Sequence, residues 1–314
     1  MEIIGSSQAI KRVKEEVRKL SKGRKNVFVI GEDGVGKGLV AEMIHLGGRD
    51  ARKPYVRLNV AGIDPGKMKK LVESTIESGE FINPVAPDHG NFKIVDGTTI
   101  ILEDLDRSGL AVQRSVCDLL AFAGKSRRGL RMMILLSVPI AQSVRDGQIL
   151  SCVAEETKYW ELVKVPPLRE RAEDIPELVE FFVKEIGNDL GMSGMVIDAN
   201  AIGVLVRQEW KENVRELKRL VERSMVLTRD KRVFKLPAGL VNEQAELTRV
   251  LDRIEEGTDF ALDNSMEIIE KGILLRTLEK FEFNQSRTAR FLKMTEDTLR
   301  YRMKKLGIPT ARKQ

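Results

Sequence analysis

The sequence predicts an α/β subdomain with a parallel sheet, then a small all-helical subdomain, and then a C-terminal all-α module. In the first half of the chain, the short apolar runs "VFVI", "TTIIL" and "MMILL" alternate with segments of helical spacing. After "KVPPLRERAEDIPEL" the spacing of apolar residues is helical from about residue 174 to residue 230. Residues 265–308 then divide into three short helices.

Composition restricts the class of protein. The 314 residues are 42% hydrophobic and 32% charged, which suits a globular protein with a substantial core. The sequence has neither a long apolar run for a membrane span nor the apolar stretch of a signal peptide. Cys117 and Cys152 are isolated, so we predict neither a disulfide framework nor a zinc site, and we expect the reducing cytoplasm. We expect no receiver or sensory domain before Met1, and therefore control by a partner, a ligand or the expression level.

The excess of positive over negative charge lies in the C-terminal module. The net charge is +6, and residues 264–314 contain twelve Lys/Arg against six Asp/Glu. The remaining residues contain 41 charges of each sign. A compact basic module indicates a polyanionic partner, most often nucleic acid, and the alternative is a solubilising tail.

The segment "GEDGVGK" lies between a predicted strand and a predicted helix and fits the phosphate-loop pattern G-x-x-x-x-G-K. Its glycines allow backbone N–H groups to surround phosphate oxygens, and Lys37 would reach the outer phosphates. Gly38 stands where a Mg²⁺-ligating Ser or Thr is expected and has no side chain. An unliganded relic loop is the alternative. The nucleotide-binding residues predicted here are Gly31, Gly34, Val35, Gly36, Lys37 and Gly38.

The predicted strand "TTIILED" ends with Glu103 and Asp104. P-loop ATPases usually place Asp first, for Mg²⁺, and in many families Glu second, to orient the attacking water. The order is reversed here, which moves each carboxylate by roughly 1.5 Å, and misplacements of about 1 Å can lower a rate about 100-fold. We therefore predict that Glu103 holds Mg²⁺ weakly and that water activation is impaired; two acids without catalytic function are the alternative.

Six segments resemble one family and occur in that family's order: "IIGSSQAIKRVKEEV", "GEDGVGKGLVAEMIH", "PYVRLNVAGI", "DGTTIILEDL", "VPPLRERAEDIPEL" and "WKENVRELKRLVERSMVL". The family is the bacterial enhancer-binding proteins, the AAA+ activators of sigma-54 RNA polymerase, and the resemblance covers residues 3–227. It implies an α/β AAA+ P-loop ATPase subdomain at 1–168, a helical lid subdomain at 169–236 and a linker at 237–264. It also implies ring-like oligomers with ATP between subunits.

The resemblance assigns roles to individual residues. Ile4 and Gly5 would border the adenine, and Asn59 would hold the water-orienting acid. Arg215 would be the lid arginine that reaches the γ-phosphate; an ordinary surface arginine is the alternative. The catalytic set implied is Glu103, Asp104 and Asn59, in an impaired form.

The working loop of the family has the sequence GAFTGA and presses on sigma-54. Its place falls on "GEFINP", where Gly79 and Phe81 resemble remnants. Ile82 replaces the contacting threonine, Asn83 replaces the following glycine, and Pro84 closes the turn. We interpret the segment as the remnant of a working loop.

The resemblance also implies arginines that enter the neighbouring subunit's site. Ungapped alignment places Ser151 and Thr157 at those positions, and only Arg145 and Lys158 lie near. Such an arginine contributes about 10³ to 10⁵ in rate. The polar residue expected after the third strand is Ser137. Together with the altered metal ligand and acid pair, these departures predict slow or absent turnover.

The tail "FNQSRTARFLKMTEDTLRYRMKKLGI" resembles the Fis-type helix-turn-helix, assigned to residues 265–314. Leu299, Met303 and Leu306 follow i, i+4, i+7 and should face the core. Lys293 replaces a turn glycine, so we expect a left-handed residue at a cost of about 1–2 kcal/mol. The residues predicted to contact DNA are Asn284, Ser286, Thr298, Arg300, Tyr301, Arg302, Lys304 and Lys305. For Asn284 and Ser286 helix capping alone is the alternative.

The acidic pair Glu296–Asp297 at the start of the reading helix would repel phosphate but could accept from cytosine. The resemblance suggests that the helix "MEIIEKGILLRTLEKF" pairs two copies, so that the module reads a two-fold site in double-stranded DNA. A dimerisation unit that does not bind DNA is the alternative.

We thus expect a sequence-specific DNA-binding transcriptional regulator that binds ATP or ADP, hydrolyses slowly and lacks the sigma-54 contact. Repression, or action on another polymerase form, follows from this reading. Two alternatives are an active sigma-54 activator and a degenerate subunit in a mixed ring with an intact homologue.

Overall fold

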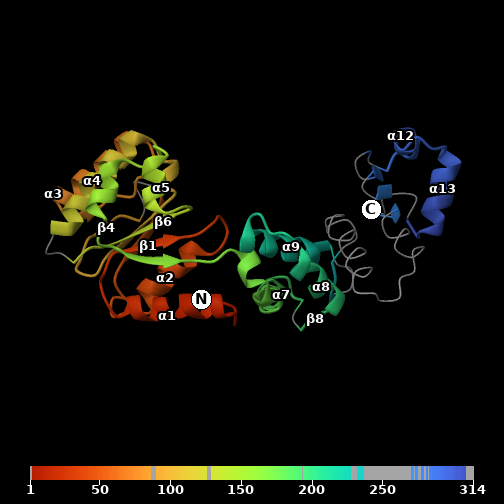
Figure 1. The fold of residues 1–314 in the computed structure, drawn as a ribbon, viewed down its shortest axis with the longest axis horizontal. Coiled ribbons are helices and arrows are strands. Elements are labelled where there is room, and N and C mark those ends of the chain that lie inside the picture. The colour runs from red at the N-terminus through yellow and green to blue at the C-terminus, as the bar shows by residue number, and fades with distance from the viewer. Residues whose placement is uncertain are drawn as a thin grey trace. The chain divides into compact units, whose positions relative to one another are not determined.

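A computed structural model of the chain describes residues 2–85, 90–125, 129–192, 194–227, 232–236, 270–271, 273–274, 277–278, 281 and 283–308 (Figure 1). The chain divides into two compact units, Met1–Leu178 with Trp210–Lys218, and Val179–Glu209 with Arg219–Gln314. This division differs from the predicted boundary after residue 168. The reason is that Asp174 bonds the N-terminal segment and Asn213 bonds the phosphate loop.

The first unit is built on a five-stranded sheet in the order β2-β5-β6-β1-β7, with every neighbouring pair parallel. The sheet confirms the predicted parallel α/β fold, and its central strands are the three apolar runs of the sequence. The edge strands β2 and β7 lack a continuous apolar run because they are partly exposed, and for this reason they were not predicted. The strands are β1 Val27–Ile30, β2 Tyr55–Asn59, β5 Thr99–Glu103, β6 Arg131–Leu136 and β7 Glu161–Lys164.

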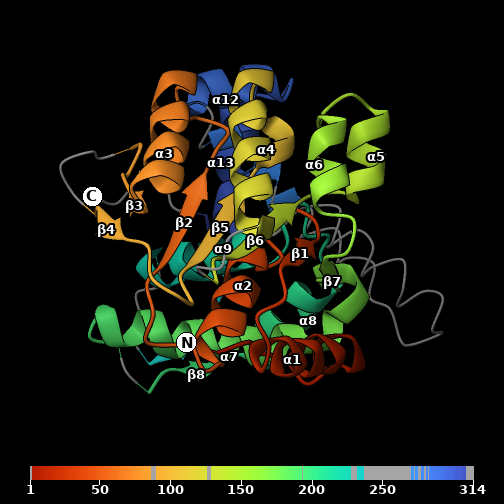
Figure 2. The same cartoon turned by 90° about the vertical axis from the view of Figure 1, so that its left-hand side faces the viewer.

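Helices cover both faces of this sheet (Figure 2). α1 (Gln8–Ser21) and α2 (Lys37–Leu46) bury their apolar faces against one side, in a core that includes Val29 and Met133. α3 (Pro65–Glu77) and α4 (Leu110–Lys125) cover the other side. The remaining elements of this unit are β3 Glu80–Phe81, β4 Phe92–Lys93, η1 Leu105–Arg107, α5 Ile140–Arg145, α6 Ser151–Glu156 and η2 Leu168–Asp174.

Helix starts follow from capping residues in the sequence. The side chain of Ser7 accepts from the N–H of Ile10 at the start of α1. Asp64 accepts from the N–H of Lys67 at the start of α3, where Pro65 takes the first helical position. Each cap satisfies an N–H group that would otherwise have no partner in the helix.

The lid segment is helical as predicted, with one small addition. Three helices, α7 (Ile175–Asp189), α8 (Ala199–Arg207) and α9 (Asn213–Leu227), account for its periodicity. The addition is a parallel pair of two-residue strands, β8 (Val196–Ile197) and β9 (Val233–Phe234). Strands this short carry no periodic signal, so the sequence pattern could not reveal them.

The C-terminal module contains α12 (Gln285–Phe291) and α13 (Glu296–Lys305). Leu299, Met303 and Leu306 are buried as predicted, in a cluster with Leu274, Leu278, Ala289 and Ile308. Lys293 has a φ of 54°, which confirms the predicted left-handed turn. The predicted linker, 237–264, lies outside the described residues, as does much of the predicted pairing helix. Within the described part of the chain, no helix is long and apolar enough to cross a membrane.

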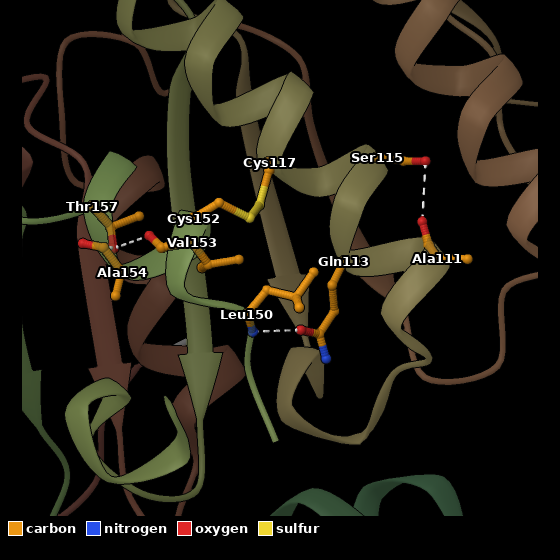
Figure 3. Close-up of a disulfide and its surroundings, with 9 residues drawn as sticks. All are labelled: Ala111, Gln113, Ser115, Cys117, Leu150, Cys152, Val153, Ala154 and Thr157. Atoms are coloured by element: carbon orange, nitrogen blue, oxygen red, sulfur yellow. Dashed lines mark hydrogen bonds between the residues drawn. A yellow bond between two sulfur atoms is a disulfide. The ribbon is translucent and has the colours of Figure 1, made fainter. Parts of the chain in front are cut away.

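The prediction that the cysteines are unpaired was wrong. Cys117 on α4 and Cys152 on α6 form a disulfide, with their Cα atoms 6.1 Å apart (Figure 3). Gln113 supports the same contact, because its amide accepts from the N–H of Leu150 and donates to the carbonyl of Gln148. The two cysteines are 35 residues apart, and only helix packing brings them together. The isolated positions of the two cysteines in the sequence therefore do not indicate a reducing compartment for this protein.

A thiol assay under denaturing conditions tests this disulfide. We expect no free thiol before reduction and two after it, because the chain has two cysteines. The double variant Cys117→Ser/Cys152→Ser should unfold at a lower temperature, since a loop of this length contributes about 3–4 kcal/mol in the chain-entropy account. Two free thiols in the unreduced protein would contradict the pairing.

Candidate functional site

The predicted phosphate loop connects β1 to α2 at the carboxyl edge of the sheet, where open α/β folds bind their ligands. Gly36 precedes α2 in a left-handed conformation. The ammonium of Lys37 lies within the curve of the loop and donates to the carbonyls of Gly31 (2.7 Å) and Glu32 (3.0 Å). Burial lowers the pKa of Lys37. The loop thus holds a cation beside the N-terminus of α2, an arrangement suited to phosphate groups.

The start of α9 packs directly on this loop. A Cβ on Gly34 would lie 1.9 Å from the carbonyl oxygen of Glu212, so only glycine fits. The N–H of Arg215 donates to the carbonyl of Gly34 (3.2 Å), and Asn213 donates to the carbonyl of Asp33 (2.9 Å). The backbone of Arg215 thus lies beside the phosphate loop and its side chain is exposed; its contact with the γ-phosphate stays a prediction. Asn213 was missed because its role depends on long-range contacts.

Asp33 interacts with two cationic side chains beside the phosphate loop. Its carboxylate accepts from Arg107 (2.6 Å) and from Ser137 (3.4 Å), and it lies 3.6 Å from the ammonium of Lys37. The bond from Arg107 lowers the pKa of Asp33. Ser137, which we interpret as an altered sensor at the end of the third strand, thus contacts Asp33.

Ile4 and Gly5 lie in the segment before α1, and Asp174 holds this segment in place. One oxygen of Asp174 accepts from the N–H groups of Ser6 (2.8 Å) and Ser7 (2.7 Å), and the other accepts from the hydroxyl of Ser7 (2.7 Å). A Cβ on Gly5 would lie 2.6 Å from the carboxyl carbon of Asp174. Asp174 was missed because it is far away in sequence, although it belongs to the quoted segment "RAEDIPEL".

The two acids of the strand end have separate partners. Asp104 adopts a left-handed conformation (φ 56°) and accepts from the amide of Asn59 at 2.6 Å. Glu103, one residue earlier, accepts from Arg57 at 2.6 Å. The parallel register that pairs Asn59 with Glu103 explains why these side chains meet. The structure thus unites the three residues predicted as catalytic and adds Arg57.

The segment expected to reach a neighbouring subunit has no arginine at the aligned positions. Thr157 is buried, and its hydroxyl donates to the carbonyl of Val153 at the end of α6 (2.6 Å). Ser151 is exposed at the start of the same helix. Arg145 and Lys158 are exposed, and the ammonium of Lys158 lies 5.6 Å from the centre of the Tyr159 ring.

The segment "GEFINP" begins a short hairpin. Phe81 in β3 is fully buried, and its ring stacks on that of Phe92 in β4 with centroids 4.8 Å apart. Asn83 follows, and its N–H donates to the side chain of Asn91 (2.8 Å). The aromatic residue of this segment therefore belongs to the core.

The C-terminal module exposes every side chain that was predicted to contact DNA. Asn284 caps α12 by accepting from the N–H of Arg287 (3.0 Å). Tyr301 is 69% exposed, which is high for an aromatic residue. Arg300 is bonded to Gln285 (3.0 Å), and Arg302 is paired with Glu270, so two of the arginines already have partners. The exposed residues are Asn284, Ser286, Thr298, Arg300, Tyr301, Arg302, Lys304 and Lys305.

Three family descriptions match successive parts of the chain. Residues 3–144 match the Sigma-54 interaction domain, residues 169–250 match the AAA+ ATPase lid domain, and residues 265–306 match the bacterial regulatory protein Fis family. The fold and these matches define an AAA+ P-loop protein with a helical lid and a Fis-type helix-turn-helix. The chain thus contains a Sigma-54 interaction domain, an AAA+ ATPase lid domain and a Fis-family helix-turn-helix.

Similar proteins support this assignment. The chain is 30% identical to the Nif-specific regulatory protein of Azotobacter vinelandii, over 98% of this chain and 59% of that protein. It is 29% identical to the transcriptional regulatory protein XylR of Pseudomonas putida, over 96% of this chain and 56% of that protein. The chain thus spans under two thirds of these relatives. The structure of NtrX from Brucella abortus in complex with ATP is 26% identical, with a TM-score of 0.65, over 98% of this chain and 70% of that one.

Two alanine substitutions test the packing on the phosphate loop. Gly36→Ala should destabilise the first unit by only about 1–2 kcal/mol, because its left-handed conformation is strained but the space is open. Gly34→Ala should destabilise the first unit more than Gly36→Ala does, since its Cβ would collide with the backbone carbonyl of Glu212. Urea unfolding followed by tryptophan fluorescence reports on this unit, which contains both tryptophans. Equal midpoints for the two variants would contradict the packing.

Proposed function

We propose that this protein is a DNA-binding transcriptional regulator that binds ATP or ADP, hydrolyses ATP slowly, and does not engage sigma-54 through a working loop. The observation that carries the proposal is that both acids of the strand end already have partners. Glu103 is bonded to Arg57 and Asp104 to Asn59. Each bond occupies one carboxylate oxygen, and the ion pair with Arg57 makes Glu103 a weaker ligand for a metal ion.

The hairpin after α3 supports the absence of a sigma-54 contact. Phe81, at the aromatic position of the family's loop, is buried against Phe92 and does not face solvent. Exposing the side chain of Phe81 to water would cost roughly 2–3 kcal/mol of hydrophobic free energy. The buried Thr157 at a finger position supports slow turnover in the same way.

Nucleotide and DNA are the two ligands of this proposal. NtrX structures carry ATP or ADP, and this chain has the phosphate loop, Lys37 and Arg215 in one site. The nucleotide would set the oligomeric state, a dimer or a ring. Two helix-turn-helix modules would then occupy a two-fold site, and occupancy would repress or act on another polymerase form. The cytoplasm, which holds bacterial DNA, is the compartment proposed.

A second candidate is an active, ATP-hydrolysing activator of sigma-54 RNA polymerase. The match of residues 3–144 to the Sigma-54 interaction domain favours it. The hydrogen bond from Asn59 to Asp104 is also what we expect if Asn59 holds the water-orienting acid until a ring assembles. A third candidate, a subunit of a mixed ring, would take its finger and its working loop from an intact homologue.

Open-complex formation at a sigma-54 promoter by this protein alone would reject our proposal.

Nucleotide binding and hydrolysis should be measured in one preparation at high protein concentration. We expect ATP to bind and turnover to be slow, lowered by about 10³ or more relative to a site with an arginine finger. Lys37→Ala should abolish binding, because the cation of the loop is lost. Lys70→Ala, an exposed lysine on α3, serves as the control and should bind normally. Robust turnover that Lys37→Ala abolishes would instead establish the second candidate.

DNA contacts can be tested on a site selected from a random duplex library. Lys304→Ala should weaken binding to all sequences alike and lower the salt slope of log K by about 1, as expected for a phosphate contact. Tyr301→Ala should lower affinity for the selected site more than for random DNA. Lys70→Ala again serves as the control. Unchanged affinity and salt slope in Lys304→Ala would argue for a dimerisation unit.

A further inference from the structure

The guanidinium of Arg57 joins three elements beneath the phosphate loop. Arg57 lies in the middle of β2, and its Nε donates to Oε1 of Glu103 at the end of β5 (2.6 Å). Its Nη1 donates to Oε1 of Glu42 on α2 (2.7 Å). Its Nη2 lies against Gly38, in the first turn of α2. No sequence pattern singled out Arg57.

This is the place where a P-loop site holds its metal. Mg²⁺ lies between the side chain after the loop lysine, normally a hydroxyl, and the acid at the end of the neighbouring strand. Those positions are Gly38 and Glu103 in this chain. The first has no oxygen to offer, and the second is bonded to a guanidinium. The residues present therefore do not fit Mg²⁺.

Gly38 and Arg57 depend on one another sterically. A Cβ on Gly38 would lie 2.4 Å from Nη2 and 2.8 Å from Cζ of Arg57. Any side chain at position 38 would force the guanidinium to move. The guanidinium of Arg57 can occupy this position only because residue 38 has no side chain. Gly38 and Arg57 therefore depend on each other.

Charge favours the arginine over a metal ion. The side chains of Glu42 and Glu103 are only 9% and 21% exposed, so both need a cation. Burial opposes the charge of Arg57, but the bonds to Glu103 and Glu42 outweigh it and raise the pKa of Arg57. A dication beside this guanidinium would be repelled, and it would have to take a carboxylate from it.

We propose that the guanidinium of Arg57 takes the place of Mg²⁺ in this nucleotide site, so that the chain binds ADP or ATP without a divalent cation. The inference rests on the proposed nucleotide-binding function and deepens it. Arg57 offsets one of the two negative charges of Glu42 and Glu103, so that Lys37 and the N-terminus of α2 can meet the phosphates without a metal ion. Phosphate recognition then needs only groups of this chain.

Fluorescence anisotropy of methylanthraniloyl-ADP with the full chain tests the proposal. We expect dissociation constants in excess EDTA and in millimolar Mg²⁺ to agree within about twofold. Affinity that falls about tenfold or more in EDTA would overturn the inference but leave nucleotide binding intact. Absence of binding in both buffers would overturn the proposed function together with the inference.

A second measurement uses Mn²⁺ as a paramagnetic probe, with nucleotide present. We expect wild-type protein to leave the Mn²⁺ spectrum as nucleotide alone does. The variant Gly38→Thr/Glu42→Gln/Arg57→Ala restores the hydroxyl, removes the guanidinium and avoids an unpaired buried acid. It should immobilise Mn²⁺ and bind the labelled ADP at least about tenfold more tightly with metal than without. Arg114→Ala, an exposed arginine on α4, is the control and should behave as wild type.

If the triple variant folds and binds labelled ADP but shows no gain from metal, Arg57 is not what excludes the ion, and the proposal fails. Circular dichroism of each variant establishes folding. The wild-type comparison in EDTA decides the proposal even if the triple variant does not fold.

Discussion

The parallel register of β2, β5, β6 and β1 is the constraint on which the site depends. Parallel strands end at the same edge of the sheet, so each loop that follows a strand delivers its polar residues there. Asn59 ends β2, Glu103 ends β5, Ser137 follows β6, and the phosphate loop follows β1. A change in any of these registers would separate Lys37 from the acids. The helices on both faces bury the apolar strands and thereby hold the edge in place.

At this edge of the sheet, the charged side chains form ion pairs with one another. Asp33 lies between Arg107 and Lys37, and Glu32 is paired with Arg169 at 2.5 Å. Arg57 is shared between Glu103 and Glu42. Exposed pairs contribute little to stability, commonly below about 1 kcal/mol, so their main effect is on orientation. The pairs decide which carboxylates remain available for chemistry, and for this reason the same loop pattern is compatible with binding and with slow turnover.

The second unit shows how local strain is tolerated where packing requires it. Lys293 is left-handed between α12 and α13, which a glycine would adopt more easily. The apolar cluster around Leu299 and Met303 fixes the angle between these helices and so holds the turn. The result is an exposed helical face on α13 with Tyr301 and basic side chains, which is the surface a DNA-reading helix needs.

The sequence by itself determined the fold class, the phosphate loop, the acidic strand end and the core face of the reading helix. Each is encoded locally, by apolar periodicity, glycine spacing or capping residues. The tertiary structure decided what required contact between distant segments. The disulfide between Cys117 and Cys152, the bonds of Asp174 to the N-terminal segment and the packing of Glu212 on Gly34 have no local signal. Arg57 belongs to the same class. In the sequence, Arg57 looks like an ordinary residue of a strand. Its guanidinium reaches Gly38 only because β2, α2 and β5 pack together.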